Sequence, residues 1–477
     1  MRKLTSLLLL ISLVLFYGCE KEGGEETESS EKKILGFRFE QLNPAITGVI
    51  NEQARTIVLT DVPAETGLAA LVPTISLSAG ATVSPASGTP QNFTNPVVYT
   101  VTAEDGSNVT YTVTATLGIE TLSGSMTANR TLPDRVPGDA ADYIIDGAFY
   151  VSGNALLTIN PGVVIRFTGV DGWIVVEGNA GLKMVGTATN PIVLTGPVNN
   201  NNKGAWGGVE YNSSRADNQM EYVSVINAGS GNYDAAVDVE YDARLSIKNC
   251  LISGSGGNGL HVMGDLTAFT NNVITGCEKA PVVFENIDPV SILDEASQLT
   301  GNTNSWVEIS YSFRDAQTAD LSLKKLAVPY LFRSGVYFER KLTLAPGASL
   351  LFDNDAFLEI ESTGTLIANA TAELPITFSH MDGTEGAWQG IFIYSALANS
   401  MQHCIVEHGG SYYFYPANLV IGEDSRLTIQ NCSLRNTTGY GVIRFNDGTI
   451  TSSSVTFSNC DLGNVYNTDE DVVSGTL

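Results

Sequence analysis

Short runs of alternating apolar and polar residues, each closed by glycine or asparagine, follow one another along most of the chain. Such alternation places the apolar side chains on one face of a β-strand. Residues 99–115 show it clearly, because apolar positions alternate on both sides of a turn at Asp105 and Gly106. The pattern predicts a hairpin there and an all-β chain with many turns, in which long helices are nearly absent.

The alternating pattern begins at residue 34 and continues to about residue 117. A segment of this length and pattern predicts a small β-sandwich. The segment resembles the immunoglobulin-like modules that follow the lipid anchor in bacterial surface proteins. That resemblance implies a stalk or spacer, and we find no catalytic constellation in these residues.

The remainder of the chain contains an internal duplication, whose two copies are offset by 181 to 185 residues. The matched segments are LLTINPGVVIRF (156–167) with KLTLAPGASLLF (341–352), NPIVLTG (190–196) with LPITFSH (374–380), GAWGGVEYNSS (204–214) with GAWQGIFIYSA (386–396), and LSIKNCLISGSGGNGLHV (245–262) with LTIQNCSLRNTTGYGVIR (427–444). Two related halves, at about residues 140–300 and 326–466, therefore follow one another. Trp206 and Trp388 recur at matched positions and are predicted to be structural.

A finer repeat within each half is marked by cysteines. Cys250 and Cys277 are 27 residues apart, and Cys404, Cys432 and Cys460 follow at intervals of 28. One coil of a parallel β-solenoid takes about that many residues, so equivalent positions are expected to stack about 4.8 Å apart.

The motifs LTIxPG, GAWxGI and NCxIxxxxxxGI make residues 118–466 resemble the right-handed parallel β-helix proteins of the pectate-lyase-like superfold. The predicted fold class is therefore all-β, with a small immunoglobulin-like β-sandwich followed by a right-handed parallel β-helix of two related halves. The resemblance implies no single function, because this fold carries lyases, hydrolases, adhesins and plain spacers.

The five cysteines after Cys19 could form disulfides in an oxidising exterior. Their regular spacing instead favours an inward-facing stack of small, buried, free thiols. They do not resemble a zinc site, because the chain has no C-x-x-C pair and no histidine at ligand spacing beside a cysteine.

Residues 1–18 have the features of a secretory signal, with a basic start and the apolar run LLLLISLVLFY, which is too short to span a bilayer comfortably. Gly18-Cys19 resembles the lipobox of bacterial lipoproteins, with Phe16 at the usual Leu position. The resemblance implies cleavage before Cys19 and lipidation of that cysteine. Residues 19–33 then form an acidic linker without a core-forming pattern.

Acidic residues directly after the cysteine resemble a surface-export signal of some Gram-negative lipoproteins. We therefore expect an outer-membrane lipoprotein that faces the exterior. The formal net charge of -26 repels nucleic-acid phosphates and anionic membranes, so nucleic acid is excluded as a partner and membrane attachment is expected only through the lipid. Apart from calcium bridging to an anionic glycan, no cofactor is expected.

The stretch IVEHGGSYYFYP, residues 405–416, gathers a carboxylate, an imidazole and four consecutive aromatics. The duplication supplies a control, because MQHCIVEHGGSY (401–412) aligns without gaps to MEYVSVINAGSG (220–231). His403 and Glu407 are expected on the outward face about 13 Å apart, too far for shared metal ligation. His408 replaces a turn asparagine, which favours a surface turn histidine over a catalytic one.

Carboxylates are most concentrated in LLFDNDAFLEIES, residues 350–362, at Asp353, Asp355, Glu359 and Glu361. Part of this set recurs in the first half, which indicates turns and a solvated face, with an incidental calcium site as the alternative. We find neither a paired-Asp hydrolase motif nor a Lys/Arg lyase constellation. The sequence therefore assigns no catalytic residue and no metal ligand.

The aromatic cluster Tyr412, Tyr413, Phe414 and Tyr415 exists in one copy of the duplication only. In a loop that leaves the solenoid, flat rings could stack on sugar C–H surfaces or anchor a protein partner. The alternative is that two of the rings fold back over the coil. These four residues are the candidate binding residues.

The sequence therefore predicts a lipid-anchored envelope or surface protein whose β-helix presents a non-catalytic binding surface to a polysaccharide or to a surface or matrix protein. The alternative is a polysaccharide lyase or glycoside hydrolase that works in the β-helix groove. Acidic, basic and histidine side chains that converge in one groove would favour the enzyme, and scattered positions would favour binding. The acidic tail, residues 467–477, is expected to fray or to form a partial cap.

Overall fold

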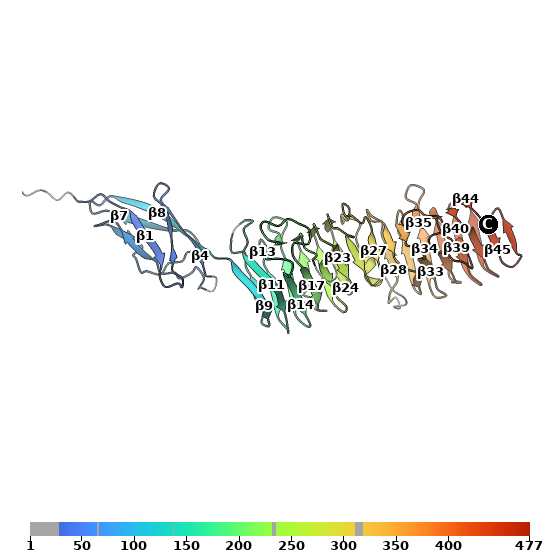
Figure 1. Cartoon of the computed structure of the whole chain (residues 1–477), viewed down its shortest axis with the longest axis horizontal. Helices are drawn as coiled ribbons and strands as arrows, with labels where there is room; N and C mark the ends of the chain where they lie inside the picture. The colour runs from blue at the N-terminus through green and yellow to red at the C-terminus, as the bar shows by residue number, and fades with distance from the viewer. Residues whose placement is uncertain (1–27, 64–65, 137, 231–234, 311–317) are drawn as a thin grey trace, which may run out of the picture. The chain divides into compact units, whose positions relative to one another are not determined.

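The computed structural model describes residues 28–63, 66–136, 138–230, 235–310 and 318–477. In this part of the chain the regular elements are strands, apart from the short 3₁₀ helix η2 (Asp288–Ile292) (Figure 1). Two compact units divide between Leu117 and Gly118. No helix in the described ranges has the length and apolar character that crossing a bilayer requires. The predicted signal segment and Cys19 lie outside the described residues.

The N-terminal unit consists of two sheets that share one core. One sheet has the order β2 (Ile46–Thr47), β1 (Ile34–Phe39), β5 (Thr74–Leu77), and the other has the order β3 (Val49–Asn51), β4 (Thr56–Val62), β8 (Asn108–Leu117), β7 (Val97–Thr102), β6 (Thr82–Ser84). Tyr99 pairs with Tyr111 across the β7–β8 hairpin, and both are buried. The Phe37 ring from the other sheet lies 5.2 Å from that of Tyr99. The predicted hairpin is therefore confirmed, and its apolar face contributes to the core.

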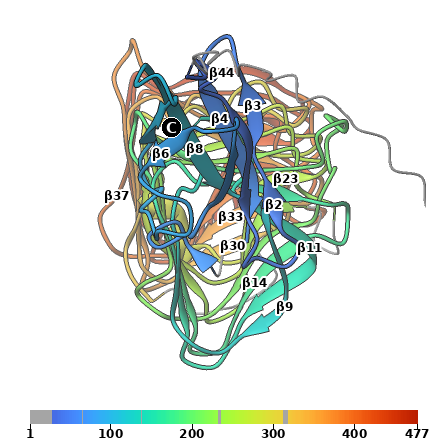
Figure 2. The same cartoon turned by 90° about the vertical axis from the view of Figure 1, so that its left-hand side faces the viewer.

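The second unit is a parallel β-solenoid in which each strand pairs with the equivalent strand of the next coil. Figure 2 looks along the stack, so that successive coils overlap. Two sheets have six strands each: β10 (Arg130–Leu132), β12 (Leu156–Ile159), β15 (Gly181–Val185), β18 (Gln219–Glu221), β21 (Arg244–Lys248), β24 (Asp265–Thr270); and β28 (Leu321–Leu323), β31 (Lys341–Leu344), β34 (Thr365–Asn369), β37 (Asn399–Gln402), β40 (Arg426–Gln430), β43 (Thr449–Ser453).

The other solenoid strands form two further sheets. The first follows β9 (Glu120–Met126), β11 (Tyr143–Val151), β13 (Val164–Phe167), β14 (Trp173–Glu177), β16 (Ile192–Thr195), β17 (Gly208–Asn212), β19 (Val223–Ile226), β20 (Ala235–Val239), β22 (Leu251–Ser253), β23 (Asn258–Val262), β25 (Val273–Thr275), β26 (Val282–Phe284), β27 (Val307–Ile309), β29 (Tyr330–Phe332), β32 (Ser349–Phe352), β35 (Ile376–His380), β38 (Cys404–Glu407), β41 (Ser433–Thr437) and β44 (Thr456–Cys460). The second follows β30 (Val336–Phe338), β33 (Phe357–Ile360), β36 (Gly390–Ile393), β39 (Ala417–Ile421), β42 (Tyr440–Arg444), β45 (Gly463–Asn467) and β46 (Val472–Ser474). The all-β prediction and the parallel β-helix are confirmed.

The duplication extends to individual contacts in the core. The Trp206 indole N–H donates to the Ile226 carbonyl at 2.8 Å, and the Trp388 indole N–H donates to the Glu407 carbonyl at the same distance. Each indole also stacks on a phenylalanine from the preceding coil, with ring centroids 3.8 Å apart for Phe167–Trp206 and 4.2 Å for Phe352–Trp388. Both tryptophans are fully buried, which confirms their structural role.

Asparagine occupies sharp bends of the solenoid. Asn249, Asn431 and Asn459 have φ angles of 52°, 53° and 53°, in the left-handed region that asparagine tolerates better than most residues. The Asn459 amide donates to the Asn436 side-chain oxygen at 2.9 Å, one coil earlier. A ladder contact between asparagines therefore exists at one bend.

The cysteines form a stack only in part. Cys250, Cys277, Cys404, Cys432 and Cys460 are free thiols, and all but Cys460 are buried. Cys404 and Cys432 lie on adjacent coils, and the Cys404 N–H donates to the Cys432 sulfur at 3.3 Å.

Equal spacing does not place the other cysteines in register. Leu251 pairs with Val273, so the coil after Cys250 spans 22 residues and Cys277 does not stack on it. Cys460 pairs with Thr437. The expectation of one inward stack of thiols is therefore wrong, because coil lengths vary.

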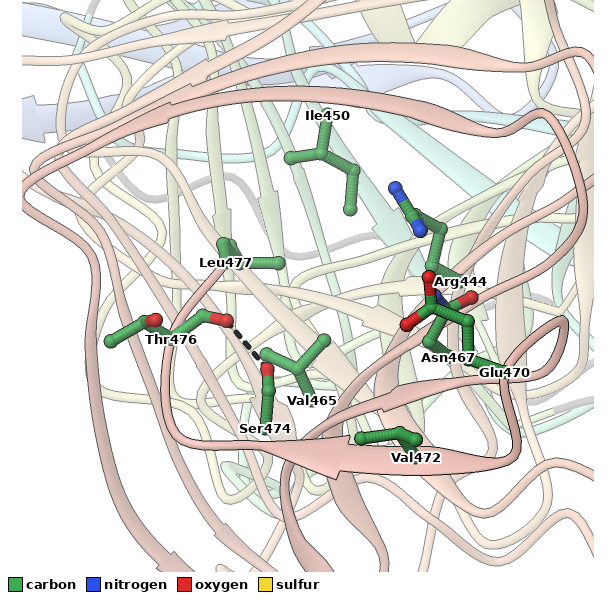
Figure 3. A pocket seen from close by; sticks show the side chains of 9 residues that line it. All are labelled: Arg444, Ile450, Val465, Asn467, Glu470, Val472, Ser474, Thr476 and Leu477. Atoms are coloured by element: carbon green, nitrogen blue, oxygen red, sulfur yellow. Dashed lines mark hydrogen bonds between the residues drawn. The ribbon is translucent and has the colours of Figure 1, made fainter.

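The C-terminal residues close one end of the solenoid. β46 pairs antiparallel with β45, and Leu477 packs against the core. A cavity of about 190 Å³ lies between this hairpin and the last coil, lined by Arg444, Ile450 and Glu470 among others (Figure 3). Ser474 donates to the Thr476 carbonyl at 2.7 Å and holds the final turn. We interpret this cavity as part of the end cap.

Candidate functional site

The aromatic loop lies between β38 and β39 and packs on the outer face of the solenoid. The Tyr412 ring lies 5.8 Å from that of Phe392 on β36, and the Tyr415 ring lies 4.7 Å from that of Phe445, which follows β42. Both contacts are close to perpendicular, the edge-to-face arrangement that aromatic pairs prefer. Two of the four candidate rings therefore fold back over the coils.

The other two rings project into solvent. Tyr413 is 88% exposed and Phe414 is 70% exposed. Their ring centroids lie 5.4 Å apart, and Phe414 also contacts Tyr412 at 5.9 Å. We call the set Tyr412, Tyr413, Phe414, Tyr415, Phe392 and Phe445 the aromatic platform. It presents two exposed rings on a packed base of four.

The strands beneath the platform carry an apolar outward row. Phe392 pairs with Val420, Val420 with Ile443, and Ile443 with Tyr466, so these four side chains follow one another along successive coils. Phe392, Val420 and Ile443 are buried beneath the surrounding rings. An outward face would ordinarily be polar, so the platform covers an unusually apolar strip.

The matching row of the first half is charged. Glu210 aligns with Phe392, Asp238 with Val420 and His261 with Ile443 in the duplication. These residues follow one another in register, since Glu210 pairs with Asp238 and Asp238 with His261. The same face is therefore charged in one copy and apolar in the other.

Charged side chains converge on this face of the first half. The His261 Nδ1 lies 3.2 Å from the Asp238 Oδ1, and its Nε2 lies 3.5 Å from the Glu285 Oε1. Asp238 is fully buried and His261 nearly so. The imidazole thus lies between two carboxylates from the preceding and following coils.

Arg333 forms the second centre of this region. Its guanidinium donates to Glu308 at 2.8 Å and to Asp353 at 2.9 Å, and it lies 5.6 Å from the Trp306 ring. The Trp306 indole N–H donates to the same Glu308 carboxylate at 3.2 Å. These contacts hold Glu308 and Arg333 in fixed orientations.

Between these two centres lies a cavity of about 380 Å³. We call it the polar groove; its main polar lining residues are His261, Lys279, Glu285, Asn304, Glu308 and Arg333. The sequence did not reveal it, because the residues come from four successive coils of unequal length. Acidic, basic and histidine side chains thus converge in one groove, which is the arrangement that favours an enzyme.

The environment of the groove shifts several pKa values. Burial lowers the pKa of His261, but the hydrogen bonds and charges of Asp238 and Glu285 outweigh it and raise the pKa above its usual range. Burial, with the nearby charges of Glu210 and Asp238, raises the pKa of Glu240. Burial also acts on Glu308, but the Arg333 hydrogen bond and charge prevail and lower its pKa.

The chemically suggestive residues of the 405–416 stretch do not meet in one site. Glu407 pairs with Arg435 on the next coil, with Nε and Oε2 2.6 Å apart. The His408 Nδ1 lies 2.8 Å from the Ser379 hydroxyl, and His408 occupies a left-handed bend with φ of 67°. His403 is at another bend, with φ of 50°.

The described residues contain no group of three or more His, Cys, Asp or Glu side chains placed to hold a metal ion. Of the acidic residues in the 350–362 segment, Asp353 pairs with Arg333 and Asp355 forms a turn with φ of 57°. Calcium binding stays a prediction.

Comparison with known proteins identifies two parts of the chain. Residues 34–115 match the family described as SGBP, N-terminal, and residues 130–213 match the pectate-lyase like beta helix domain. A crystal structure of a protein from Bacteroides thetaiotaomicron, provisionally named a glycoside hydrolase, is 34% identical over 20% of this chain and 27% of that one, with a TM-score of 0.17. No curated protein matches the chain. Residues 34–115 are therefore similar to an SGBP N-terminal domain, and residues 130–213 of the solenoid are similar to a pectate-lyase-like β-helix domain.

Proposed function

We propose that this protein is a lipid-anchored, surface-exposed glycan-binding protein. In this proposal the N-terminal domain is a spacer. The β-helix binds glycan chains through the aromatic platform and does not catalyse a reaction on them. The SGBP match supports the proposal, because SGBP denotes a surface glycan-binding protein. The observation that most directly supports this binding site is the exposure of Tyr413 and Phe414 on a base of packed rings.

The platform suits a sugar ligand for two physical reasons. A flat ring offers the C–H face of a pyranose a large contact area at little conformational cost. Tyr412 and Tyr415 are fixed by Phe392 and Phe445, so the loop loses less freedom when a ligand binds than an unsupported loop would.

Glycan binding can be tested with the purified full chain. We would measure its retardation in affinity gels that contain plant, algal or host polysaccharides, with and without calcium. Retardation by at least one polysaccharide supports the proposal. Migration that is unchanged in every gel would refute it.

The anchor can be tested separately in cells. Cys19→Ala should remove the lipidated residue and release the protein into the soluble fraction. Protease added to intact cells should digest the wild-type protein if it faces outward. A Cys19→Ala protein that stays in the membrane fraction would contradict the anchor.

The polar groove favours a second candidate function, the cleavage of a glycan chain. The pKa of Glu308 in the groove is lowered, and the pKa of Glu240, which interacts with the groove residue His261, is raised; carboxylates with pKa values shifted in opposite directions are common in acid–base sites. Incubation with the same polysaccharides would release new reducing or unsaturated ends if the groove cuts. The absence of such ends would leave binding as the function.

A further inference from the structure

The polar groove is lined by residues that are not part of the aromatic platform. Its floor includes Val283, which lies between His261 and Glu308 in the outward row. Asn258, Asn304 and Ser310 add amide and hydroxyl groups around this apolar floor. Polar groups of both donor and acceptor type therefore surround a small apolar surface.

We propose that the polar groove is a second saccharide subsite, which binds one neutral sugar unit through its hydroxyl groups. The proposal rests on the proposed function in one respect, which is that the ligand is a saccharide. The volume of about 380 Å³ lies within the range of about 300–1,000 Å³ typical of small-molecule sites.

The chemistry of the lining matches a sugar, which alternates hydroxyl groups with C–H surface. The Asn304 side-chain amide has no hydrogen-bond partner among the described residues, so it can offer both a donor and an acceptor. The Ser310 hydroxyl already donates to Glu308 at 3.1 Å and can accept a hydrogen bond from a ligand. Val283 supplies contact for the C–H groups between the hydroxyls.

Charge pairing favours a neutral ligand over a uronic acid. His261 already faces Asp238 and Glu285, and Arg333 already binds Glu308 and Asp353. A ligand carboxylate would have to compete with these side chains and would lie beside their negative charges. Hydroxyl groups can instead bridge the existing pairs without adding charge.

Trp306, which contacts two lining residues of the groove, can report on its occupancy. Trp306 lies against Arg333 and donates to Glu308, so its emission should change when a sugar occupies the groove. Trp206 and Trp388 are buried in the core and should not respond. The Trp306→Phe variant therefore separates a groove signal from any other tryptophan response.

The experiment uses the full chain with Tyr413→Ala and Phe414→Ala, which removes the exposed rings of the platform. Glucose, galactose, mannose and xylose are titrated, with glucuronate and galacturonate as acidic counterparts. We follow tryptophan emission and saturation-transfer NMR. At least one neutral sugar should give saturable effects in both measurements, and Trp306→Phe should abolish only the emission change.

Asn304→Ala and Lys279→Ala should each weaken that binding by roughly three- to tenfold, the loss expected for one hydrogen bond. Both positions are at least partly exposed, so the variants should fold, and Asn154→Ala on an exposed turn is the matched control. Unchanged affinity in both groove variants, no saturable effect of any neutral sugar, or tighter binding of the uronates would overturn the proposal. If the Tyr413→Ala, Phe414→Ala protein binds a single sugar but no longer binds the polysaccharide, the groove and the platform are two distinct binding sites. Polymer binding by the wild type without any groove signal would overturn the groove alone.

Discussion

The Glu407 carboxylate accepts a hydrogen bond from the Arg435 Nε at 2.6 Å, across adjacent coils of the solenoid. This pair accounts for the carboxylate that makes the 405–416 stretch resemble an active site in the sequence. Its carboxylate stabilises coil stacking, and the neighbouring His408 forms a bend instead of joining a proton relay. The part of the stretch that is free to contact a ligand is the exposed pair of rings.

Glu407→Gln should therefore affect stability and leave glycan binding unchanged. The Arg435 side chain is 39% exposed and that of Glu407 is 16% exposed, so we expect the free energy of unfolding to fall by about 1 kcal/mol or less. Urea unfolding of the variant, with the exposed Glu423→Gln as control, measures this loss. A loss of glycan affinity at unchanged stability would show that Glu407 contacts the ligand.

Trp388→Ala should destabilise the second half strongly. The indole is fully buried, stacks on Phe352 and donates to the Glu407 carbonyl, so its removal leaves a cavity and an unpaired acceptor. Large aromatic deletions in cores cost about 3–5 kcal/mol. Trp206→Ala should cost a similar amount because its contacts are the same. A much smaller loss for either variant, measured by thermal unfolding, would contradict the equivalence of the two halves.

His261 should make the stability of the solenoid depend on pH. Its folded pKa is raised above 6.5 because Asp238 and Glu285 favour the charged ring, and Glu240 lies nearby as a further acidic group. A raised pKa contributes stability that is fully present below the unfolded pKa and is lost as pH rises through the folded pKa. The urea midpoint should therefore fall as pH increases above about 6.5.

His261→Gln should remove this part of the pH dependence, with His403→Gln at an outer bend as the control. The comparison needs urea midpoints for the three proteins across neutral and mildly alkaline pH. Identical pH profiles for the wild type and His261→Gln would show that the two carboxylates do not hold the ring protonated.

Local features of the fold could be predicted from the sequence because they depend on neighbouring residues or on the duplication. The pairing of Tyr99 with Tyr111 follows from alternation around one turn. The burial of Trp206 and Trp388 follows from their recurrence at matched positions. Neither inference requires knowledge of how successive coils are aligned.

The polar groove and the base of the platform could not be predicted, because both depend on coil register. Ser224 pairs with Leu251 after 27 residues, whereas Leu251 pairs with Val273 after 22. A constant period would place His261 beside the wrong residues. Likewise, Phe392 and Phe445 are far apart in sequence and meet the aromatic loop only through the stacking of coils.

The most direct test of the proposed function is the affinity of the full chain for the polysaccharide that retards it most, before and after Tyr413→Ala and Phe414→Ala. Tyr241→Ala is the matched control, because Tyr241 is a 71% exposed tyrosine of the first half outside the platform. We predict that loss of the two rings weakens binding by roughly tenfold or more, whereas Tyr241→Ala leaves it unchanged. Equal affinity of the double variant and the wild type would contradict glycan binding by the aromatic platform.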